Sequence, residues 1–202
     1  VQLRSSPKQV GAAWLNKILR ETFNLPFNTE SEDSVYFCVG ENPSFLVRFN
    51  DLLFSIHNVP ERYFELSEEE LKKYVPELRM RKLLREHKAW MSMDMMTVPP
   101  ERKQEAYQIM GQFTAAMVDE ETVGLYATEL DRCVPYEPAQ KDILCSEEPL
   151  EVFGAAVQVP VVESVDEEAM ERAVAEARRR WPEFEERFQQ RANEEMYAVK
   201  FP

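Results

Sequence analysis

Four charged residues are the candidates for a binding site in this chain. Asp94 is the best placed of its 37 acidic residues, because it lies within an otherwise apolar run. Glu129, Asp131 and Arg132 follow the next expected strand. Because ligand sites beside crossover connections lie at strand ends, we expect Asp94, Glu129 and Asp131 to line one edge of a sheet. The simpler alternative has Asp94 facing solvent beside Ser92.

The two histidines give little support for catalysis. Nucleophilic catalysis needs a base beside its nucleophile. His57 ends an apolar run, whereas His87 ends a basic helical segment, where a histidine commonly stabilises the helix dipole. We therefore predict no catalytic residue, and a small enzyme stays an open alternative.

The cysteines are three in number and far apart, which does not suggest a disulfide framework. We expect Cys38, Cys133 and Cys145 to be reduced and mostly buried. The alternative is a reactive Cys133, because the positive charge of Arg132 would favour its thiolate.

Metal and nucleotide sites lack the residues they need. A zinc site takes about four nitrogen or sulfur ligands at short spacing, and the chain has no such cluster. Phosphate-binding loops need closely spaced glycines, but the five glycines here are isolated from one another. The methionines at 91, 93 and 95 could offer a soft, adaptable surface, although their alternation indicates core packing. The sequence thus predicts neither a cofactor nor a metal.

Negative charge is concentrated in one quarter of the chain. The net charge is −13, and residues 119–168 alone hold 14 acidic against two basic residues. Residues 1–20, by contrast, hold four basic residues and no acidic one. An acidic surface repels phosphate backbones, which argues against nucleic-acid binding and favours a basic protein as partner. The alternative is that the carboxylates serve solubility alone.

Membrane association is not expected from this sequence. No apolar run approaches the roughly 18 residues that a membrane-spanning helix needs. The chain starts without an apolar signal segment, and its cysteines are expected to be reduced. We therefore expect a cytoplasmic protein.

Strands and helices that position the candidate residues follow from hydrophobic periodicity and turn residues. Strands are expected at 34–39, 44–49, 52–57, 89–96, 122–128, 155–162 and 197–201. Helices are expected at 7–23, from 68 to about 86 with an interruption at Pro76, at 100–118, at 139–145 and after the capping box Ser164–Glu167. Another capping box, Ser67–Glu70, opens the second of these helices.

The fold class follows from one crossover. The strand at 89–96, the helix at 100–118 and the strand at 122–128 have the length of a right-handed βαβ unit, so the two strands should be parallel. The apolar stripe of that helix consists of Ala106, Met110, Phe113 and Met117. We expect an α+β fold with a mixed, largely antiparallel sheet and helices packed on one face, plus a smaller C-terminal helix–strand unit.

Two units are expected along the chain. Residues 1–154 should form an α+β sandwich domain, and residues 155–202 the truncated start of a second α+β unit. In the second unit an apolar stripe runs from Met170 to Phe188, with a kink at Pro182. Its last strand should add to the first sheet or pair with a second molecule, which would give a homodimer.

A family resemblance covers the second half of the chain. The segments Ala175–Phe184 and Tyr197–Phe201 resemble the opening of the YegJ-like bacterial domain of unknown function, over residues 165–202. The segment from His87 to Asp94, continued by Val123–Tyr126, is similar to a second uncharacterised bacterial family, over residues 75–130. The resemblance implies a bacterial origin and two units, and it implies no activity.

Two functions remain after these exclusions. The preferred one is a non-catalytic binding or adaptor protein, of the immunity or inhibitor type, whose acidic region docks a basic partner. The alternative is a small enzyme or ligand-binding domain with a site near Asp94, Glu129 and Asp131. A deep pocket beside Asp94 would favour the alternative.

Overall fold

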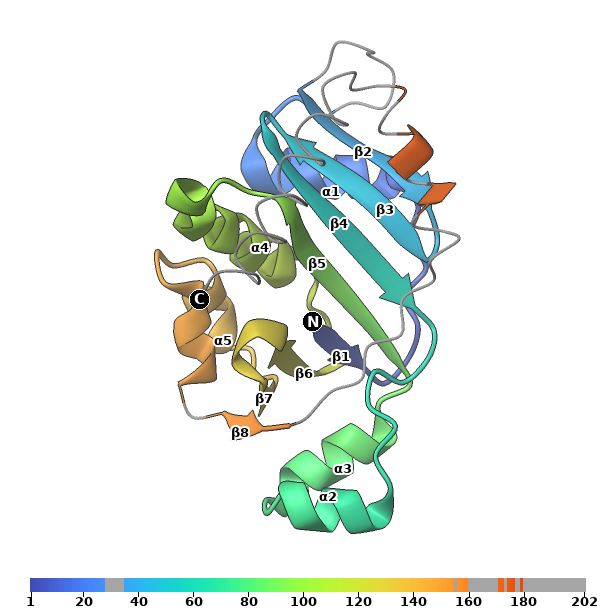
Figure 1. Cartoon of the computed structure of the whole chain (residues 1–202), viewed down its shortest axis with the longest axis vertical. Helices are drawn as coiled ribbons and strands as arrows, with labels where there is room; N and C mark the ends of the chain where they lie inside the picture. The colour runs from blue at the N-terminus through green and yellow to red at the C-terminus, as the bar shows by residue number, and fades with distance from the viewer. Residues whose placement is uncertain (28–34, 155, 160–170, 173, 177–178, 180–202) are drawn as a thin grey trace, which may run out of the picture.

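The computed structural model describes residues 1–27, 35–154, 156–159, 171, 172, 174–176 and 179. Within these residues the chain forms an α+β fold around a single eight-stranded sheet (Figure 1). The order of the strands across the sheet is β2-β3-β4-β5-β1-β6-β7-β8. Every pair of neighbouring strands is antiparallel.

The strands agree in most cases with the expected ones. Their bounds are β1 Gln2–Arg4, β2 Tyr36–Glu41, β3 Ser44–Phe49, β4 Leu52–Val59, β5 Ala89–Thr97, β6 Thr122–Ala127, β7 Arg132–Pro135 and β8 Val157–Gln158. The meander β2-β3-β4 is confirmed, with tight turns at 42–43 and 50–51. Strands β1 and β7 were not predicted, because neither is long enough to show a period.

Strand β1 lies in the middle of the sheet. It pairs with β5 through Gln2 opposite Met91, and with β6 through Gln2 opposite Leu125. Because both neighbours are antiparallel to β1, β5 and β6 run in the same direction, as the crossover predicted. They are not adjacent, however, since β1 separates them.

One face of the sheet is covered by two helices, α1 (Ala12–Phe23) and α4 (Lys103–Met117). Each begins later than expected, because Gly11 precedes α1 and a 3-10 turn, η1 (Pro100–Arg102), precedes α4. The predicted stripe of α4 is confirmed, since Ala106, Phe113 and Met117 are buried in this core and Met110 packs against it. Met91, Met93 and Met95 belong to the same core, which confirms that they point to one face of β5.

The opposite face has its own cover near β1, β6 and β7. Helices α2 (Glu68–Tyr74) and α3 (Leu78–Glu86) form a hairpin there, seen at the lower end of Figure 1. Their side chains pack with Leu3, Trp90, Tyr126 and Cys133 in a second apolar cluster. The capping box Ser67–Glu70 and the interruption at Pro76 are both confirmed. Helices therefore lie on both faces of the sheet.

After β6 the chain builds a small layer beside α4. It consists of η2 (Thr128–Leu130), β7, α5 (Gln140–Leu144) and η3 (Pro149–Phe153), and it buries Leu144, Val152 and Phe153 against β6. Gly111 permits the contact, because a Cβ there would come within 2.3 Å of the Leu144 carbonyl oxygen and 2.6 Å of Pro149 Cβ. We name residues 137–151 the acidic lobe.

Residues after Gly154 are described only in part. Strand β8 pairs with β7 at the edge of the same sheet. Residues 171, 172, 174–176 and 179 are helical, and Val174 packs against a third cluster that contains Phe37, Leu46 and Leu53. The Ser164–Glu167 capping box, the kink at Pro182 and the strand at 197–201 lie outside the described residues. The division at residue 154 therefore stays a prediction.

Candidate functional site

A cleft of about 1000 Å³ opens where the sheet divides between β5 and β6. Strand β5 forms one wall, the end of β6 with η2 forms the other, and α4 lies along one side. Leu144, Pro149, Leu150 and Phe153 close the cleft toward the acidic lobe. Both Asp94 and Glu129 line it, so the structure brings together two of the predicted site residues.

The edges of the two strands face this cleft. Five consecutive residues of β5, Met91–Met95, line it, as do six consecutive residues from Leu125 to Leu130. Side chains alternate between the two faces of a strand, so a cavity that lay over one face would touch every second residue only. A continuous run of lining residues indicates that the backbone edge itself borders the cavity.

Strand β1 pairs with only the first part of β5. Strand β5 pairs with β4 from Trp90 to Thr97, but it pairs with β1 only from Ala89 to Met91. On the β1 side, no strand among the described residues pairs with 92–97. The cleft lies beside Val1 and Gln2, between the unpaired edge of β5 and the end of β6.

Asp94 is one of three acidic residues that line this site, with Glu101 and Glu129. It is half-buried on β5, and its Oδ2 accepts a hydrogen bond of 2.5 Å from the Ser92 hydroxyl. Among the described residues, no lysine or arginine forms an ion pair with it. Asp94 lies beside Ser92, as the simpler alternative expected, and it also lines the cleft.

Glu129 already has partners at the mouth of the cleft. The Tyr107 hydroxyl donates a hydrogen bond to it, and Lys103 Nζ lies 3.4 Å from its Oε1. The hydrogen bond to Tyr107 and the charge of Glu129 raise the pKa of Lys103, so the lysine stays charged. Burial and the Glu129 carboxylate also raise the pKa of Tyr107. The charge of Glu129 is consequently offset by Lys103, whereas no lysine or arginine among the described residues pairs with Asp94.

Asp131 and Arg132 do not belong to the cleft, and this part of the predicted site is corrected. Asp131 is the left-handed residue that ends η2, and its Oδ1 accepts a hydrogen bond of 3.1 Å from the Tyr126 hydroxyl. Arg132 is exposed at the start of β7, where its Nη1 lies 3.5 Å from the Phe153 carbonyl oxygen. Neither residue lines the cleft.

Both histidines serve the packing of the fold. The Nδ1 of His57 lies 3.1 Å from the buried Ser44 hydroxyl on the neighbouring strand. The Nε2 of His87 accepts hydrogen bonds from the backbone N–H groups of Tyr63 and Phe64, and its Nδ1 donates to the Leu84 carbonyl at 2.8 Å. Burial lowers the pKa of His87 to about 4. His87 is therefore a neutral structural residue and does not stabilise the α3 dipole as a cation.

The cysteines are free, and the alternative of a reactive Cys133 is wrong. Cys133 is buried, and burial raises its pKa to about 12, so the neighbouring Arg132 does not produce a thiolate. Burial also raises the pKa of Cys38. Cys145 is the exposed one of the three.

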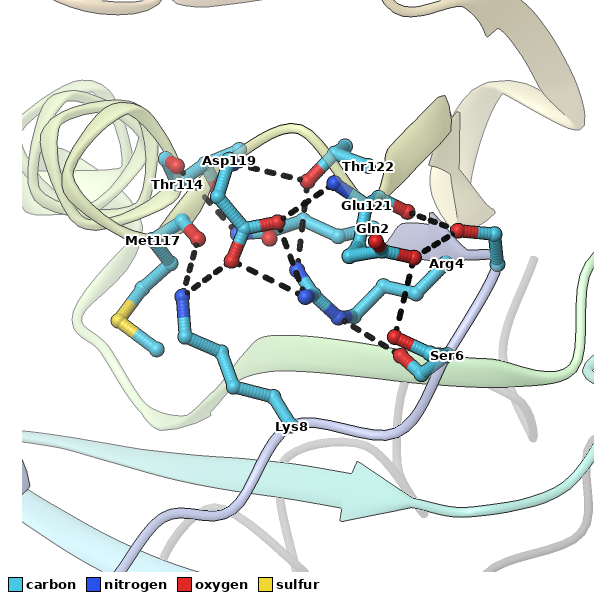
Figure 2. Close-up of polar contacts among 10 residues, drawn as sticks. Gln2, Arg4, Ser6, Lys8, Thr114, Met117, Asp119, Glu121 and Thr122 are labelled. Atoms are coloured by element: carbon cyan, nitrogen blue, oxygen red, sulfur yellow. Dashed lines mark hydrogen bonds and ion pairs between the residues drawn. The ribbon is translucent and has the colours of Figure 1, made fainter.

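An ion-pair network fixes β1 at the inner end of the cleft (Figure 2). Arg4 is buried and its Nη2 donates to Asp119 Oδ2 at 3.0 Å, while Lys8 Nζ contacts the same carboxylate at 2.8 Å. Gln2 Nε2 donates to the Thr114 carbonyl oxygen on α4 at 3.3 Å. Two of the four basic residues in 1–20, Arg4 and Lys8, thus pair with Asp119, the first residue of the acidic stretch 119–168.

Gln2 is a further site residue that sequence reasoning missed. Its side chain is 2% exposed and lines the cleft, and its Oε1 is buried without a hydrogen-bond donor among the described residues. No local signal marks Gln2, because its role depends on β1 reaching the centre of the sheet. Tyr107 and Lys103 were missed for a related reason: they lie on the polar side of an ordinary amphipathic helix.

Several features bear on the chemistry of the site. Among the described residues, no three His, Cys, Asp or Glu side chains gather as ligands for a metal ion. No helix in the described part of the chain is long and apolar enough to cross a membrane.

Comparison with protein-family models, with curated proteins and with solved structures finds no match to this chain. The resemblance to the YegJ-like domain therefore stays a prediction without support from these comparisons.

Proposed function

We propose that this protein is a binding protein whose cleft accepts a ligand with an apolar body and a cationic group. The observation that carries the proposal is the position of Asp94: a half-buried carboxylate, without an ion-pair partner among the described residues, in a cavity of about 1000 Å³. Clefts of this size, mostly apolar with a few placed polar groups, are the usual sites for small ligands and peptide segments.

The walls of the cleft suit an apolar ligand. Met93, Met95, Met110 and Phe113 all line it. Methionine side chains are flexible and polarizable, so they adapt to ligands of different shape. The sequence pattern indicated core packing for the methionines on β5, and they do belong to the core; they lie at its border with the cleft.

The charge of the site favours a cation over an anion. Glu101, Asp94 and Glu129 line the cleft, against Lys103, which is bound to Glu129, and the ammonium group of Val1, which donates to the Tyr126 carbonyl oxygen at 2.7 Å. A charged hydrogen bond between a ligand ammonium group and Asp94 contributes about 1.5–3 kcal/mol to binding, that is, roughly tenfold or more in affinity. We therefore expect discrimination between ligands of the same shape and opposite charge.

The test compares three ligands of equal length: hexylammonium, hexanol and hexanoate. Hexylammonium should bind most tightly to the unchanged protein, and Asp94→Asn should weaken its binding roughly tenfold while leaving hexanol unaffected. Asp142→Asn is the matched control, because Asp142 is exposed on α5 and does not line the cleft. Equal affinity of all three ligands, or an equal effect of the two substitutions, would contradict the proposal.

A second candidate, docking of a basic protein on the acidic surface, is favoured by the exposure of the acidic lobe. Asp142, Glu147, Glu148 and Glu151 are all exposed there. Binding of a 20-residue oligolysine that falls steeply with salt and is weakened by the triple variant D142N/E147Q/E148Q, but not by Asp94→Asn, would support this candidate. Binding that the triple variant leaves unchanged would exclude it.

A further inference from the structure

We propose that two copies of this chain associate through two neighbouring surfaces of opposite charge, so that the turn of the α2–α3 hairpin in each copy contacts the acidic lobe of the other. We name residues 72–82, which contain this turn, the basic tip. The inference is independent of the cleft. It rests on the second candidate function, docking of a basic protein on the acidic lobe, and names a second copy of the chain as that protein.

The basic tip and the acidic lobe are complementary in charge. The tip holds five basic residues against one acidic residue, in a chain whose net charge is −13. The lobe, residues 137–151, holds five acidic residues against one basic residue. Surfaces of opposite potential steer association and fix the register of the partners. The two surfaces therefore match each other in both the sign and the number of their charges.

Most of these charges have no partner within the chain. In the tip, Lys72, Lys73 and Arg81 form no ion pair among the described residues. The same holds in the lobe for Asp142, Glu147, Glu148 and Glu151. All of these side chains except that of the half-buried Arg81 are exposed, so they can reach a second molecule.

Both surfaces also expose apolar side chains. Leu78, the first residue of α3, is 75% exposed, more than any other large hydrophobic residue in the described part of the chain. Tyr74, the last residue of α2, is 43% exposed, and Ile143 on α5 is 37% exposed. Protein interfaces combine an apolar centre with a polar rim. The tip and the lobe each contain both parts of such an interface.

One ion pair shows that the two surfaces lie side by side. Arg79 Nη1 in the tip lies 2.9 Å from Oε1 of Glu137, the first residue of the lobe, and both side chains are more than half exposed. The hairpin projects from the body of the molecule, which leaves its turn accessible (Figure 1). A two-fold axis beside this ion pair exchanges tip and lobe, so each tip meets the lobe of the other copy. Such self-complementary dimers are the commonest form of protein oligomer.

The test measures dimerisation by sedimentation velocity, from low micromolar to submillimolar protein, at about 150 mM salt. At this ionic strength the screening length is about 8 Å, so the repulsion between two acidic copies is reduced while charges in contact still attract. The unchanged chain should form dimers that dissociate on dilution. Charge reversal in the tip, K72E/K73E/K82E, and charge reversal in the lobe, D142K/E147K/E148K, should each weaken dimerisation at least tenfold.

An equimolar mixture of the two charge-reversed variants is the matched control. In a mixed dimer the reversed tip of one variant meets the reversed lobe of the other, and the unchanged tip meets the unchanged lobe. The mixture should therefore associate about as tightly as the unchanged chain. Because mixing cannot repair a misfolded variant, restored association distinguishes lost charge pairing from a lost fold.

Leu78 tests the apolar part of the interface. Leu78→Ser should weaken dimerisation about tenfold, since a leucine side chain is no longer removed from water. It should leave the free energy of unfolding of the monomer nearly unchanged, because Leu78 is exposed there. Val35→Ser is the control: Val35 is also exposed but precedes β2, at the other edge of the sheet, so dimerisation should not change.

Three results would overturn the inference. These are a chain that stays monomeric over the whole concentration range, dimers that both charge reversals leave intact, and a mixture of the two variants that does not associate. The second candidate function is judged separately by oligolysine. If the chain stays monomeric while oligolysine still binds the lobe, self-association is overturned and docking of a basic protein stands.

Discussion

Arg4 and Asp119 form the ion pair on which the centre of the sheet depends. The Arg4 side chain is 2% exposed, and its Nη2 lies 2.9 Å from Asp119 Oδ1. Arg4 belongs to β1, and Asp119 follows α4 directly before β6, so the pair joins the central strand to the crossover (Figure 2). Burial alone would raise the pKa of Asp119, but hydrogen bonds from Arg4 and Lys8 lower it to about 2.

We predict that Asp119→Asn destabilises the protein by about 3 kcal/mol, because it leaves the charge of buried Arg4 without its partner. Glu121→Gln is the matched control: Glu121 is exposed and accepts hydrogen bonds from Ser5 and Ser6 only at the surface, so its loss should destabilise the protein much less. Chemical denaturation of both variants measures the difference. Equal effects would show that Arg4 does not depend on Asp119.

The His87 imidazole predicts a loss of stability in mild acid. Its folded pKa of about 4 lies below the usual value of 6.5, so the unfolded chain binds a proton first as the pH falls. Stability is therefore unaffected above about pH 6.5 and decreases below it, by roughly 2 kcal/mol at pH 5. Carboxylates contribute little in this window, because those with lowered pKa values, such as Asp119, titrate at lower pH.

The measurement is the free energy of unfolding at pH 7.5 and at pH 5, for the unchanged protein and for His87→Gln. Glutamine does not titrate, so the variant should start less stable but lose less between the two pH values. An identical loss in both proteins would assign the acid sensitivity to another group.

The close packing at Gly111 allows a test of the contact between α4 and the acidic lobe. A Cβ at this position would collide with backbone and proline atoms of α5 and η3 that cannot move independently of the lobe. We expect Gly111→Ala to cost about 1–3 kcal/mol through overpacking. Gly11→Ala is the control, because nothing lies within 4 Å of its added Cβ, and its cost should stay below about 1 kcal/mol.

Thiol titration distinguishes the three cysteines. Cys38 and Cys133 are buried and Cys145 is exposed, so a disulfide reagent should react rapidly with one thiol in the native protein and with three after denaturation. Cys145→Ser should remove the rapid phase. A rapid phase that survives this substitution would mean that a buried thiol becomes accessible in the native state.

The parts of the fold that were predicted from the sequence are those that neighbouring residues determine. The meander of β2-β3-β4, the capping box Ser67–Glu70, the stripe of α4 and the alternation on β5 all depend on neighbouring residues. Strand β1 could not be predicted, because three residues show no period and its position in the sheet comes from contacts with residues at least 85 positions away. Strand β1 lies between β5 and β6 and is antiparallel to both, so these two strands run in the same direction without being adjacent.

Two of the four predicted site residues line the cleft, and these two were recognisable from their neighbours in the sequence. Asp94 was recognisable as a polar residue in an apolar strand, and Glu129 as a residue at the end of the next strand. Asp131 and Arg132 were placed with them because the turn after β6 was not foreseen. The cleft itself is lined by segments that are far apart in the sequence, so no local pattern could indicate it.

The central claim is tested most directly by the methionine methyl groups, observed by NMR in protein labelled at those methyls, while hexylammonium is added. The resonances of Met93, Met95 and Met110, which line the cleft, should shift with the same binding curve, and that of Met80, buried under α3, should not. Asp94→Asn should weaken the response roughly tenfold. Shifts confined to methyl groups outside the cleft, or a response that the substitution leaves unchanged, would contradict the account.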